Sequence, residues 1–394
     1  MSSPKNIKSN NNTEKILSKS IDVAEQFNEY FTIIGPNLAA KIFSNNDFEH
    51  YLNDSNPASF FFRPVNENDI ANEIFRLDPQ KAMGQDCIHP RLIIDAAYHI
   101  SHPLAHIANS SITQSIFPDA LKVAKIIPLY KKGSALDVSN YRPISILPVL
   151  SKIIESIINK QLMSFLDKYN ILLPSQYGFR KKFNTKLALA DLVSDIVDKM
   201  DEGFVTFGIF IDLKKAFDTI DHQILLKKLA YYGVRGLPLK WFHSYLSNRQ
   251  QAVNIDSTMS AQRLIKCGVP QGSILGPILF LLYINDINQS TNAFVFRLFA
   301  DDTNLFKYMK THTCTIDLNT INNDIGKVIE WCNANKLTVS VDKTNYMIMK
   351  TPPKRTQIIG HLTMTGTPIE GVQTATYLGV SIDPSLTWKS HIEK

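Results

Sequence analysis

Val205-Thr-Phe-Gly-Ile-Phe-Ile-Asp212 is a short, almost wholly apolar run that ends in a carboxylate. Such a run is typical of a β-strand that is buried on both faces. A charged residue at the end of a buried strand is equally compatible with a solvated strand terminus or a helix cap. Asp212 therefore becomes informative only together with other carboxylates.

A second apolar feature, Phe296 to Ala300 followed by Thr303 to Phe306, carries Asp301 and Asp302 between its halves and predicts a tight hairpin. Turns favour aspartate for backbone reasons, so the pair alone is weak evidence. Two neighbouring carboxylates at an apolar tip repel each other unless cations or water offset the repulsion. Together with Asp212 they suit hard divalent cations such as Mg²⁺. Two such ions, about 3.5–4 Å apart, clamp an in-line phosphoryl displacement.

Between these carboxylates lies a loop rich in glycine and proline, Gly268-Val-Pro-Gln-Gly-Ser-Ile-Leu-Gly-Pro277. Bare backbone of this kind lets a nucleotide or template approach closely, and Gln271 is a candidate to lie under an incoming base pair. An ordinary loop leading into a helix from Ile278 to Ile287 explains the segment equally well. The chain has no Walker A loop, GxGxxG fingerprint, HExxH or GxSxG motif. The sequence therefore lacks the usual motifs of ATPases, dinucleotide-dependent enzymes and serine hydrolases.

The remaining pattern predicts alternating helices and strands. We expect residues 1–12 to be disordered, residues 44–60 to form a linker, and Asp221 to cap a helix from Gln223 to Leu229. Apolar spacing predicts helices near Ile21 to Tyr30, from Asn66, from Leu150 to Phe165 and from Leu189 to Met200, and strands at Val123 to Leu129 and Tyr141 to Leu147.

The composition of the 394 residues, 44% hydrophobic and 20% charged, excludes a disordered polyelectrolyte and a low-complexity fibre. The net charge of +6 and the pI near 8.9 fit a nucleic-acid partner without requiring one. The longest apolar run, Ile274 to Ile284, is interrupted by Gly276 and Pro277 and is too short for a membrane span, which needs about 20 residues.

The four cysteines, Cys87, Cys267, Cys314 and Cys332, lie far apart, so neither a zinc site nor a disulfide framework is expected. They are typical of reduced intracellular thiols, and residues 1–15 are polar, unlike a signal peptide. We therefore expect an intracellular protein without a membrane partner, with nucleus and cytoplasm both compatible.

The ordered motifs resemble a known family. Asp212-Leu-Lys-Lys-Ala-Phe-Asp218, Gly268-Val-Pro-Gln-Gly-Ser273 and Phe299-Ala-Asp-Asp302 resemble the A, B and C motifs of reverse transcriptases. Two segments before them, Asn140-Tyr-Arg-Pro-Ile144 and Gln176-Tyr-Gly-Phe-Arg180, resemble the fingers motifs of that family. Asp342-Lys-Thr344 resembles the lysine-bearing D motif, and Tyr377-Leu-Gly-Val380 the primer-side E motif.

The amino-acid sequences of these motifs most resemble those of non-LTR retrotransposons of the jockey and LINE type. The resemblance covers roughly Phe117 to Asp383, and Ala24 to Gly35 is similar to the segment that precedes the polymerase in such elements. It implies RNA-directed DNA synthesis, with an RNA template, a DNA primer and dNTPs as partners and two Mg²⁺ ions, or Mn²⁺ in their place, as cofactors.

The resemblance also implies an α+β right-hand polymerase fold with an antiparallel palm sheet backed by helices. We expect a disordered start with a linker and helical segment over residues 1–65, a helical segment over 66–116 and the reverse transcriptase domain over 117–383. Within the domain the fingers would span 117–200, the palm 201–350 and the start of a primer-side region 351–383. Residues 384–394 are expected to be a truncated end without most of the thumb. With no N-terminal endonuclease either, we expect a fragment of a longer polyprotein or a truncated genomic copy.

Site roles follow from the motif positions. Asp212, Asp301 and Asp302 would hold the metals, and Phe217 would act as a steric gate against the ribose 2′-hydroxyl, although core packing also accounts for this ring. Candidates for nucleotide contact are Lys131 or Lys132, Arg142, Gln271 and Lys343, the last a general acid toward pyrophosphate or a plain surface lysine. Candidates for template or primer contact are Arg180, Gly272, Tyr377, Leu378 and Gly379.

Three alternatives to an active polymerase of this kind remain. The first is a catalytically silent nucleic-acid-binding remnant of such an element. The second is the polymerase of a group II intron protein or of telomerase, against which the absence of a maturase extension and of a telomerase RNA-binding region argues. The third is an unrelated globular protein with accidental motifs.

Overall fold

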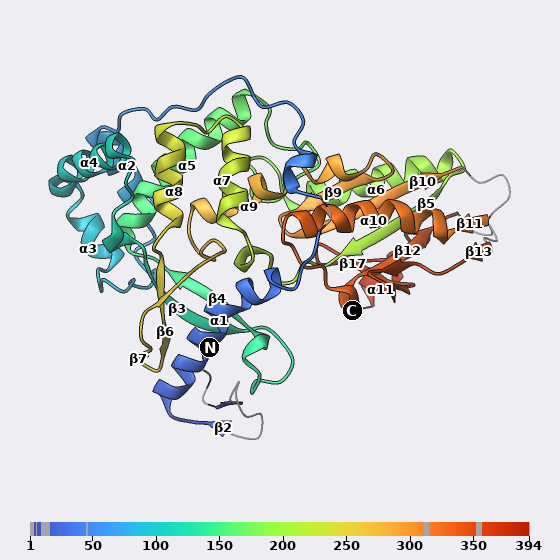
Figure 1. The fold of residues 1–394 in the computed structure, drawn as a ribbon, viewed down its shortest axis with the longest axis horizontal. Coiled ribbons are helices and arrows are strands. Elements are labelled where there is room, and N and C mark those ends of the chain that lie inside the picture. Colours follow the sequence, from blue (N-terminus) through green and yellow to red (C-terminus); the bar gives the residue numbers. More distant parts are fainter. Residues whose placement is uncertain are drawn as a thin grey trace. The chain divides into compact units, whose positions relative to one another are not determined.

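The computed structural model describes residues 4, 6–8, 16–44, 46–310, 315–351 and 357–393. The chain divides into two compact units, each assembled from segments that are distant in sequence (Figure 1). We call Met1–Lys41, Asp54–Ile171 and Phe217–Tyr283 unit 1, and Ile42–Asn53, Leu172–Ala216 and Ile284–Lys394 unit 2.

Unit 2 is built on a five-stranded sheet in the order β16-β12-β5-β10-β9. The strands are β16 (Glu370–Gly371), β12 (Asn345–Met349), β5 (Val205–Ile211), β10 (Asp302–Met309) and β9 (Val295–Phe299). All pairs are antiparallel except β12 with the short edge strand β16. All seven residues of the central strand β5 are buried, which explains why this strand is apolar on both faces.

Helix α6 (Thr185–Asp201) covers one face of this sheet. Its Leu192 and Ile196 pack into a cluster with Phe210, Phe306 and Met347. The other elements of unit 2 are η1 (Phe48–Tyr51), η5 (Ile287–Ser290), β11 (Thr315–Asp317), α10 (Leu318–Ala334), η6 (Val341–Lys343), β13 (Gln357–Ile359), β14 (Thr363–Met364), β15 (Thr367–Pro368), β17 (Ala375–Tyr377), β18 (Val380–Ile382) and α11 (Lys389–Ile392).

Unit 1 contains a second sheet in the order β4-β3-β6-β7, with β8 also paired to β6. These strands are β3 (Val123–Tyr130), β4 (Tyr141–Ile146), β6 (Gln250–Ile255), β7 (Thr258–Met259) and β8 (Arg263–Leu264). Helix α1 (Ser20–Ala39) packs on this sheet, and the ring of its buried Phe27 meets that of Tyr141 edge-on at 4.9 Å.

Four helices of unit 1 share another core: α2 (Glu67–Phe75), α3 (Pro90–Asp95), α4 (Ala97–Gln114) and α5 (Val149–Lys168). The remaining elements of unit 1 are β1 (Ile7–Lys8), β2 (Ile16–Leu17), η2 (Asp119–Leu121), η3 (Val138–Asn140), α7 (His222–Tyr231), α8 (Leu237–Leu246) and α9 (Leu275–Ile284), with η4 (Ala216–Asp218) where the chain passes from unit 2 to unit 1. An Asn66 capping box starts α2, and Asp221 caps α7 as the sequence predicts.

Three sequence expectations need correction. The predicted helix from Ile278 to Ile287 is α9, which spans Leu275–Ile284, and Ile287 instead begins the 3₁₀ turn η5. The helix begins three residues earlier than predicted because the Ser273 hydroxyl accepts the Gly276 N–H and because proline is tolerated in a first turn. The predicted helix near Ile21 to Tyr30 continues to Ala39. Ile7 and Lys8 form β1 instead of being disordered, and residues 1–3, 5 and 9–12 of the expected disordered start lie outside the described residues.

Two further observations bear on the expected class. Cys87, Cys267 and Cys332 form no disulfide, while Cys314 and the terminal Lys394 lie outside the described residues. None of the helices found in the described ranges combines the length and the apolar character that crossing a membrane requires.

Candidate active site

Asp212 lies immediately after β5, where the strand leaves the sheet of unit 2. Its backbone is fixed by the neighbouring segment, because the Ser340 N–H donates to the Asp212 carbonyl over 2.7 Å and Leu213 forms a bridge with Val339. The Asp212 side chain remains 40% exposed. The end of the buried strand therefore presents this carboxylate to solvent on a fixed backbone.

Asp301 and Asp302 lie at the turn of the β9–β10 hairpin, as predicted. Asp302 pairs with Phe299 and is exposed, Asp301 is partly buried, and Ala300 has a left-handed φ of 54°. Such a conformation is uncommon for a residue with a side chain and is found frequently at functional sites.

The register between β5 and β10 relates Asp302 to Asp212. Thr303 of β10 pairs with Ile211 of β5 in the antiparallel sense. Continuing that register by one residue sets Asp302 opposite Asp212, on strands that lie roughly 4.8 Å apart. The fold of unit 2 thus brings together, at one edge of the sheet, carboxylates that are about 90 positions apart in the sequence.

Lys343 also belongs to this edge. It closes the short 3₁₀ turn η6, and its Nζ lies 3.3 Å from Asp212 Oδ2. The hydroxyl of the next residue, Thr344, accepts the backbone N–H of Asp212 over 3.5 Å. The segment that resembles the D motif therefore lies directly against the residue that begins the A motif.

The donor chemistry at this edge suits Mg²⁺, since all three side chains offer carboxylate oxygens close to solvent. Within the described ranges, no group of three or more His, Cys, Asp or Glu side chains is gathered as a ready metal site. Asp212 is instead paired with the ammonium of Lys343. The three aspartates thus have the ligand type that Mg²⁺ prefers and lie at neighbouring strand ends. Their side chains are not gathered around a common point where an ion would bind.

Tyr377, Leu378 and Gly379 form the turn of a second tight hairpin in unit 2. Tyr377 pairs with Val380, and Leu378 and Gly379 both have positive φ, at 48° and 86°. Two positive φ values in a two-residue loop match the twist of the flanking strands. Burial raises the pKa of the Tyr377 hydroxyl above its ordinary value, so this side chain is part of the core and the turn is the exposed part.

Arg180 is engaged within its own loop in unit 2. Its Nη1 donates to the carbonyls of Leu173 and Gln176 over 2.9 and 3.1 Å, and its guanidinium lies 4.4 Å from the ring centroid of Phe183. These contacts give Arg180 a structural role within its own loop, and the contact with template or primer stays a prediction.

The predicted triphosphate contacts lie on the β3–β4 hairpin of unit 1. Lys131 and Lys132 are exposed in the loop that follows β3. Arg142 is exposed on β4 opposite Leu129, between the buried Tyr141 and Pro143. The hairpin thus presents these cations to solvent, and which lysine would contact a nucleotide stays open.

The glycine-rich loop of unit 1 is held against β4 by its backbone. Ser145 N–H donates to the Gln271 carbonyl over 2.8 Å. Gly272 has a φ of 128°, and a Cβ there would lie 2.4 Å from the Ser145 carbonyl oxygen. The Gln271 side chain donates to Asp218 Oδ1 over 2.8 Å. Glycine is therefore required at position 272 by close approach and by conformation.

Phe217 packs beside this loop. Its ring stacks on that of Phe280 in α9, with centroids 4.5 Å apart and an interplanar angle of 22°. The residue remains only partly buried. Core packing accounts for one face of the ring, which leaves the gate function as a prediction.

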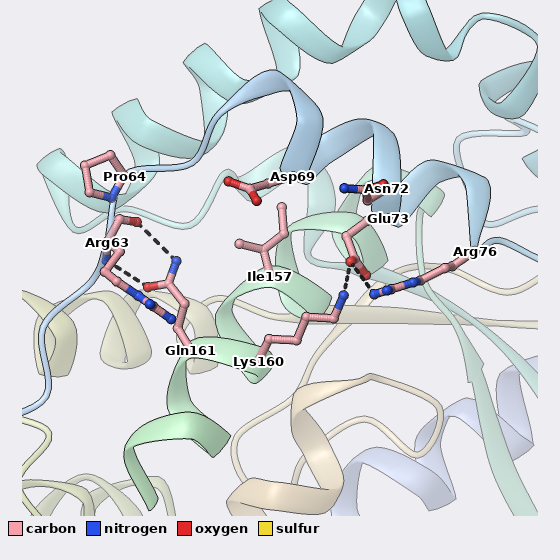
Figure 2. A pocket seen from close by; sticks show the side chains of 9 residues that line it. All are labelled: Arg63, Pro64, Asp69, Asn72, Glu73, Arg76, Ile157, Lys160 and Gln161. Atoms are coloured by element: carbon pink, nitrogen blue, oxygen red, sulfur yellow. Dashed lines mark hydrogen bonds and ion pairs between the residues drawn. The ribbon is translucent and has the colours of Figure 1, made fainter. Parts of the chain in front are cut away.

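The pocket drawn in Figure 2 lies wholly in unit 1, between α2 and α5, and shares no residue with the predicted site. It has a volume of about 370 Å³ and mixes cations with acids. Glu73 there accepts hydrogen bonds from Lys160, from Arg76 over 3.0 Å and from Ser156 over 2.5 Å. These acid–base contacts join α2 to α5, so they explain the pocket as a structural junction.

Comparison with known proteins identifies the class. A model of the family "Reverse transcriptase (RNA-dependent DNA polymerase)" matches residues 129–382. The chain therefore belongs to the reverse transcriptase family, whose members are nucleotidyltransferases of mixed α+β fold. The sequence prediction of this family is confirmed.

Individual relatives narrow the resemblance to the jockey type. The chain is 29% identical over 355 residues to the RNA-directed DNA polymerase from mobile element jockey of Drosophila melanogaster, covering 87% of this chain and 38% of that protein. It is 27% identical to the probable RNA-directed DNA polymerase from transposon BS and 28% identical to that from transposon X-element, both of Drosophila melanogaster, over 84% of this chain and 37% and 36% of those proteins. The chain thus spans a little over a third of the length of these relatives.

Proposed function

We propose that this chain is an RNA-directed DNA polymerase of a non-LTR mobile element, which adds dNTPs to a primer 3′-hydroxyl while copying RNA. One observation carries the proposal: in a chain of the reverse transcriptase family, Asp212 and the Asp301–Asp302 turn lie at the same edge of one sheet. The likeness to the polymerase of mobile element jockey supports the choice of element type.

Within this proposal the sheet of unit 2 is the palm and the β3–β4 hairpin of unit 1 belongs to the fingers. The antiparallel β5–β10–β9 core backed by α6 supports the palm assignment. The exposed cations Lys131, Lys132 and Arg142 support the fingers assignment. The boundaries 117–200 for fingers and 201–350 for palm stay predictions, as do the primer-side region 351–383 and the intracellular location in nucleus or cytoplasm.

Asp212, Asp301 and Asp302 are the residues that would hold two divalent ions, Mg²⁺ or Mn²⁺. When bound, such ions activate the primer hydroxyl and neutralise the charge of the departing pyrophosphate. Lys343, now paired with Asp212, would be released to the triphosphate, and its ammonium would donate a proton to the pyrophosphate. Arg142 suits bidentate contact with a phosphate group.

Substitution of Asp212 tests the proposal. Asp212→Asn keeps the side-chain volume but removes a charge that binds metal, so we expect primer extension with dNTPs on an RNA template to fall by roughly a thousandfold or more. Binding of a primer–template duplex, measured by fluorescence anisotropy, should stay within about twofold of the wild type, because phosphate contacts by basic residues dominate that affinity.

Asp201→Asn is the matched control. Asp201 is an exposed aspartate that ends α6 just before the other end of β5, and its substitution should leave both readouts unchanged. Absence of any product from folded wild-type protein would refute the polymerase proposal. If RNA binding then persisted and was unaffected by Asp301→Ala, the silent-remnant alternative would replace it.

A further inference from the structure

The Gln176 side chain connects two backbone segments of unit 2. It is 2% exposed, and its Oε1 accepts the N–H of Gly178 over 2.8 Å and the N–H of Ala300 over 3.0 Å. Gly178 follows two residues later in the same loop, whereas Ala300 belongs to the turn that carries Asp301 and Asp302. One amide oxygen therefore links the loop before α6 to the carboxylate-bearing turn.

The backbone around Gln176 reinforces this connection. Gln176 forms a parallel bridge with Leu298 of β9, the Tyr177 N–H donates to the Leu298 carbonyl over 2.9 Å, and the Leu298 N–H donates to Ser175 over 2.9 Å. A Cβ at Gly178 would lie 2.3 Å from the Ala300 nitrogen. The loop is thus fitted against the turn closely enough that position 178 accommodates only glycine.

Ala300 needs such a partner for two reasons. Ala300 is the first residue of a two-residue hairpin loop, where the backbone N–H has no acceptor in the opposite strand. Because Ala300 is only 5% exposed, water does not readily accept this hydrogen bond either. Its φ of 54° is also disfavoured for a residue with a side chain. The Gln176 oxygen satisfies the N–H in that conformation, which stabilises the turn that directs Asp301 and Asp302.

We propose that Gln176 is a positioning residue, whose side-chain oxygen holds Ala300 in its left-handed conformation and thereby orients the two aspartates of the turn. The inference rests on the proposed polymerase function for its catalytic consequence. Its structural part, the restraint on the Ala300 amide, does not depend on that function.

The test replaces the amide by a group of similar shape without an acceptor. Gln176→Met should lower the rate of single-nucleotide addition at saturating dNTP by about tenfold or more and raise the Mg²⁺ concentration needed for half-maximal rate. Primer–template affinity and the KM for dNTP should change by less than about threefold, because the turn positions metal ligands and not the nucleic acid. Gln176→Glu retains an oxygen acceptor and should recover most of the rate.

A second substitution addresses the left-handed conformation directly. Glycine adopts positive φ at little cost, so Ala300→Gly should reduce the need for the restraint. In the double variant Gln176→Met/Ala300→Gly, the loss caused by Gln176→Met should shrink to about threefold or less. An equal loss in the Ala300→Gly background would show that Gln176 does not act through the conformation of residue 300.

Asn285→Ala is the matched control for loss of a buried amide. Asn285 is 7% exposed, and its side-chain oxygen accepts the N–H of Leu173, in the same loop as Gln176. It should lower thermal stability about as much as Gln176→Met does while leaving the Mg²⁺ dependence of the rate unchanged. An equal change in Mg²⁺ dependence would reduce Gln176 to a general structural role.

Hydrogen exchange separates this proposal from the polymerase proposal. In Gln176→Met the Ala300 amide should exchange about tenfold faster or more, whether or not the protein makes DNA, while amides in the middle of β5 keep their protection. Unchanged exchange at Ala300 would overturn the proposal. If exchange rises but the wild type makes no DNA, the polymerase proposal fails and the restraint on Ala300 stands.

Discussion

Phe217 shows how one side chain can serve packing and selectivity. One face of its ring is stacked on Phe280, which fixes the orientation of the ring. An oriented ring beside a nucleotide would collide with a ribose 2′-hydroxyl and tolerate a deoxyribose, because rejection requires a rigid obstacle. The stacking is therefore compatible with the gate that the family resemblance implies.

Substitution of Phe217 by a smaller residue should relax the choice of sugar. We expect Phe217→Val to raise the ratio of rNTP to dNTP incorporation, measured as kcat/KM for each, by roughly tenfold or more. Phe280→Leu, which removes the stacking partner but keeps an apolar side chain, should change the ratio less. Unchanged selectivity in Phe217→Val would remove this residue as the gate.

Helices α2 and α5 are joined by Glu73, which is only 6% exposed. Burial tends to raise the pKa of this carboxyl, but hydrogen bonds from Lys160 and Ser156 and the charges of Lys160 and Arg76 outweigh burial and lower the pKa below its ordinary value. The charged form of Glu73 therefore stabilises the folded state, and Figure 2 shows the cations and acids that surround this junction.

Glu73→Gln should destabilise the protein by about 1–3 kcal/mol at pH 7, measured by denaturant unfolding. A carboxyl whose pKa is lowered in the folded state stabilises the protein fully at pH values above its unfolded-state pKa, near about 4.3. This stabilisation is lost as the pH falls through the folded-state pKa. The difference between wild type and variant should accordingly be constant above about pH 5.5 and shrink below about pH 4.5. Glu67→Gln, at a mostly exposed glutamate of the same helix, should show neither effect; a difference that grows with acidification would contradict the assignment.

The glycine-rich loop depends on backbone approach instead of side-chain contact. Gly272→Ala combines a disfavoured φ with a Cβ 2.4 Å from the Ser145 carbonyl, so we expect a loss of about 2–4 kcal/mol in unfolding free energy and a lower rate of nucleotide addition. Gly236 also has positive φ, at 62°, but a Cβ added there would meet nothing within 4 Å, so Gly236→Ala should cost only about 1 kcal/mol and leave the rate unchanged. Equal losses in the two variants would show that close approach to β4 is unimportant.

For the molecule as a whole, the N-terminal segment belongs to the core of unit 1. Phe27 and Phe31 of α1 pack into one buried cluster with Ile126 of β3, Tyr141 of β4 and Val253 of β6. The Asn28 side chain donates to the Ala261 carbonyl over 2.7 Å. The region similar to the segment that precedes the polymerase is thus packed on the sheet of unit 1.

Phe27→Ala should therefore destabilise unit 1 by about 3–5 kcal/mol, because it leaves a cavity beneath the sheet. The unfolding temperature measured by calorimetry should fall by roughly 10 °C, at about 2–4 °C for each kcal/mol. Phe61→Ala, at a 74% exposed phenylalanine of the same unit, should change it by less than about 2 °C. A small effect of Phe27→Ala would mean that α1 is not part of the stable core.

Local patterns in the chain were sufficient to predict several of the helices and strands. Neighbouring residues alone predict the buried strand β5, the helices α5 and α6, the Asp221 cap and the hairpin around Asp301–Asp302. This is possible because short stretches of sequence determine which faces of an element are buried and where the chain turns. The family followed from the order of its motifs, since a match of several motifs in sequence does not require knowledge of their contacts.

Contacts between distant segments required the folded chain. Four contacts join residues that are far apart in the sequence, and each depends on strand register or on side-chain packing between segments. They are the contacts of Gln176 with Ala300, of Lys343 with Asp212, of Gly272 with Ser145, and of α1 with the β3–β6 sheet. No local period encodes such pairings, because a one-residue shift in register would preserve every local pattern and still move each partner to the opposite face.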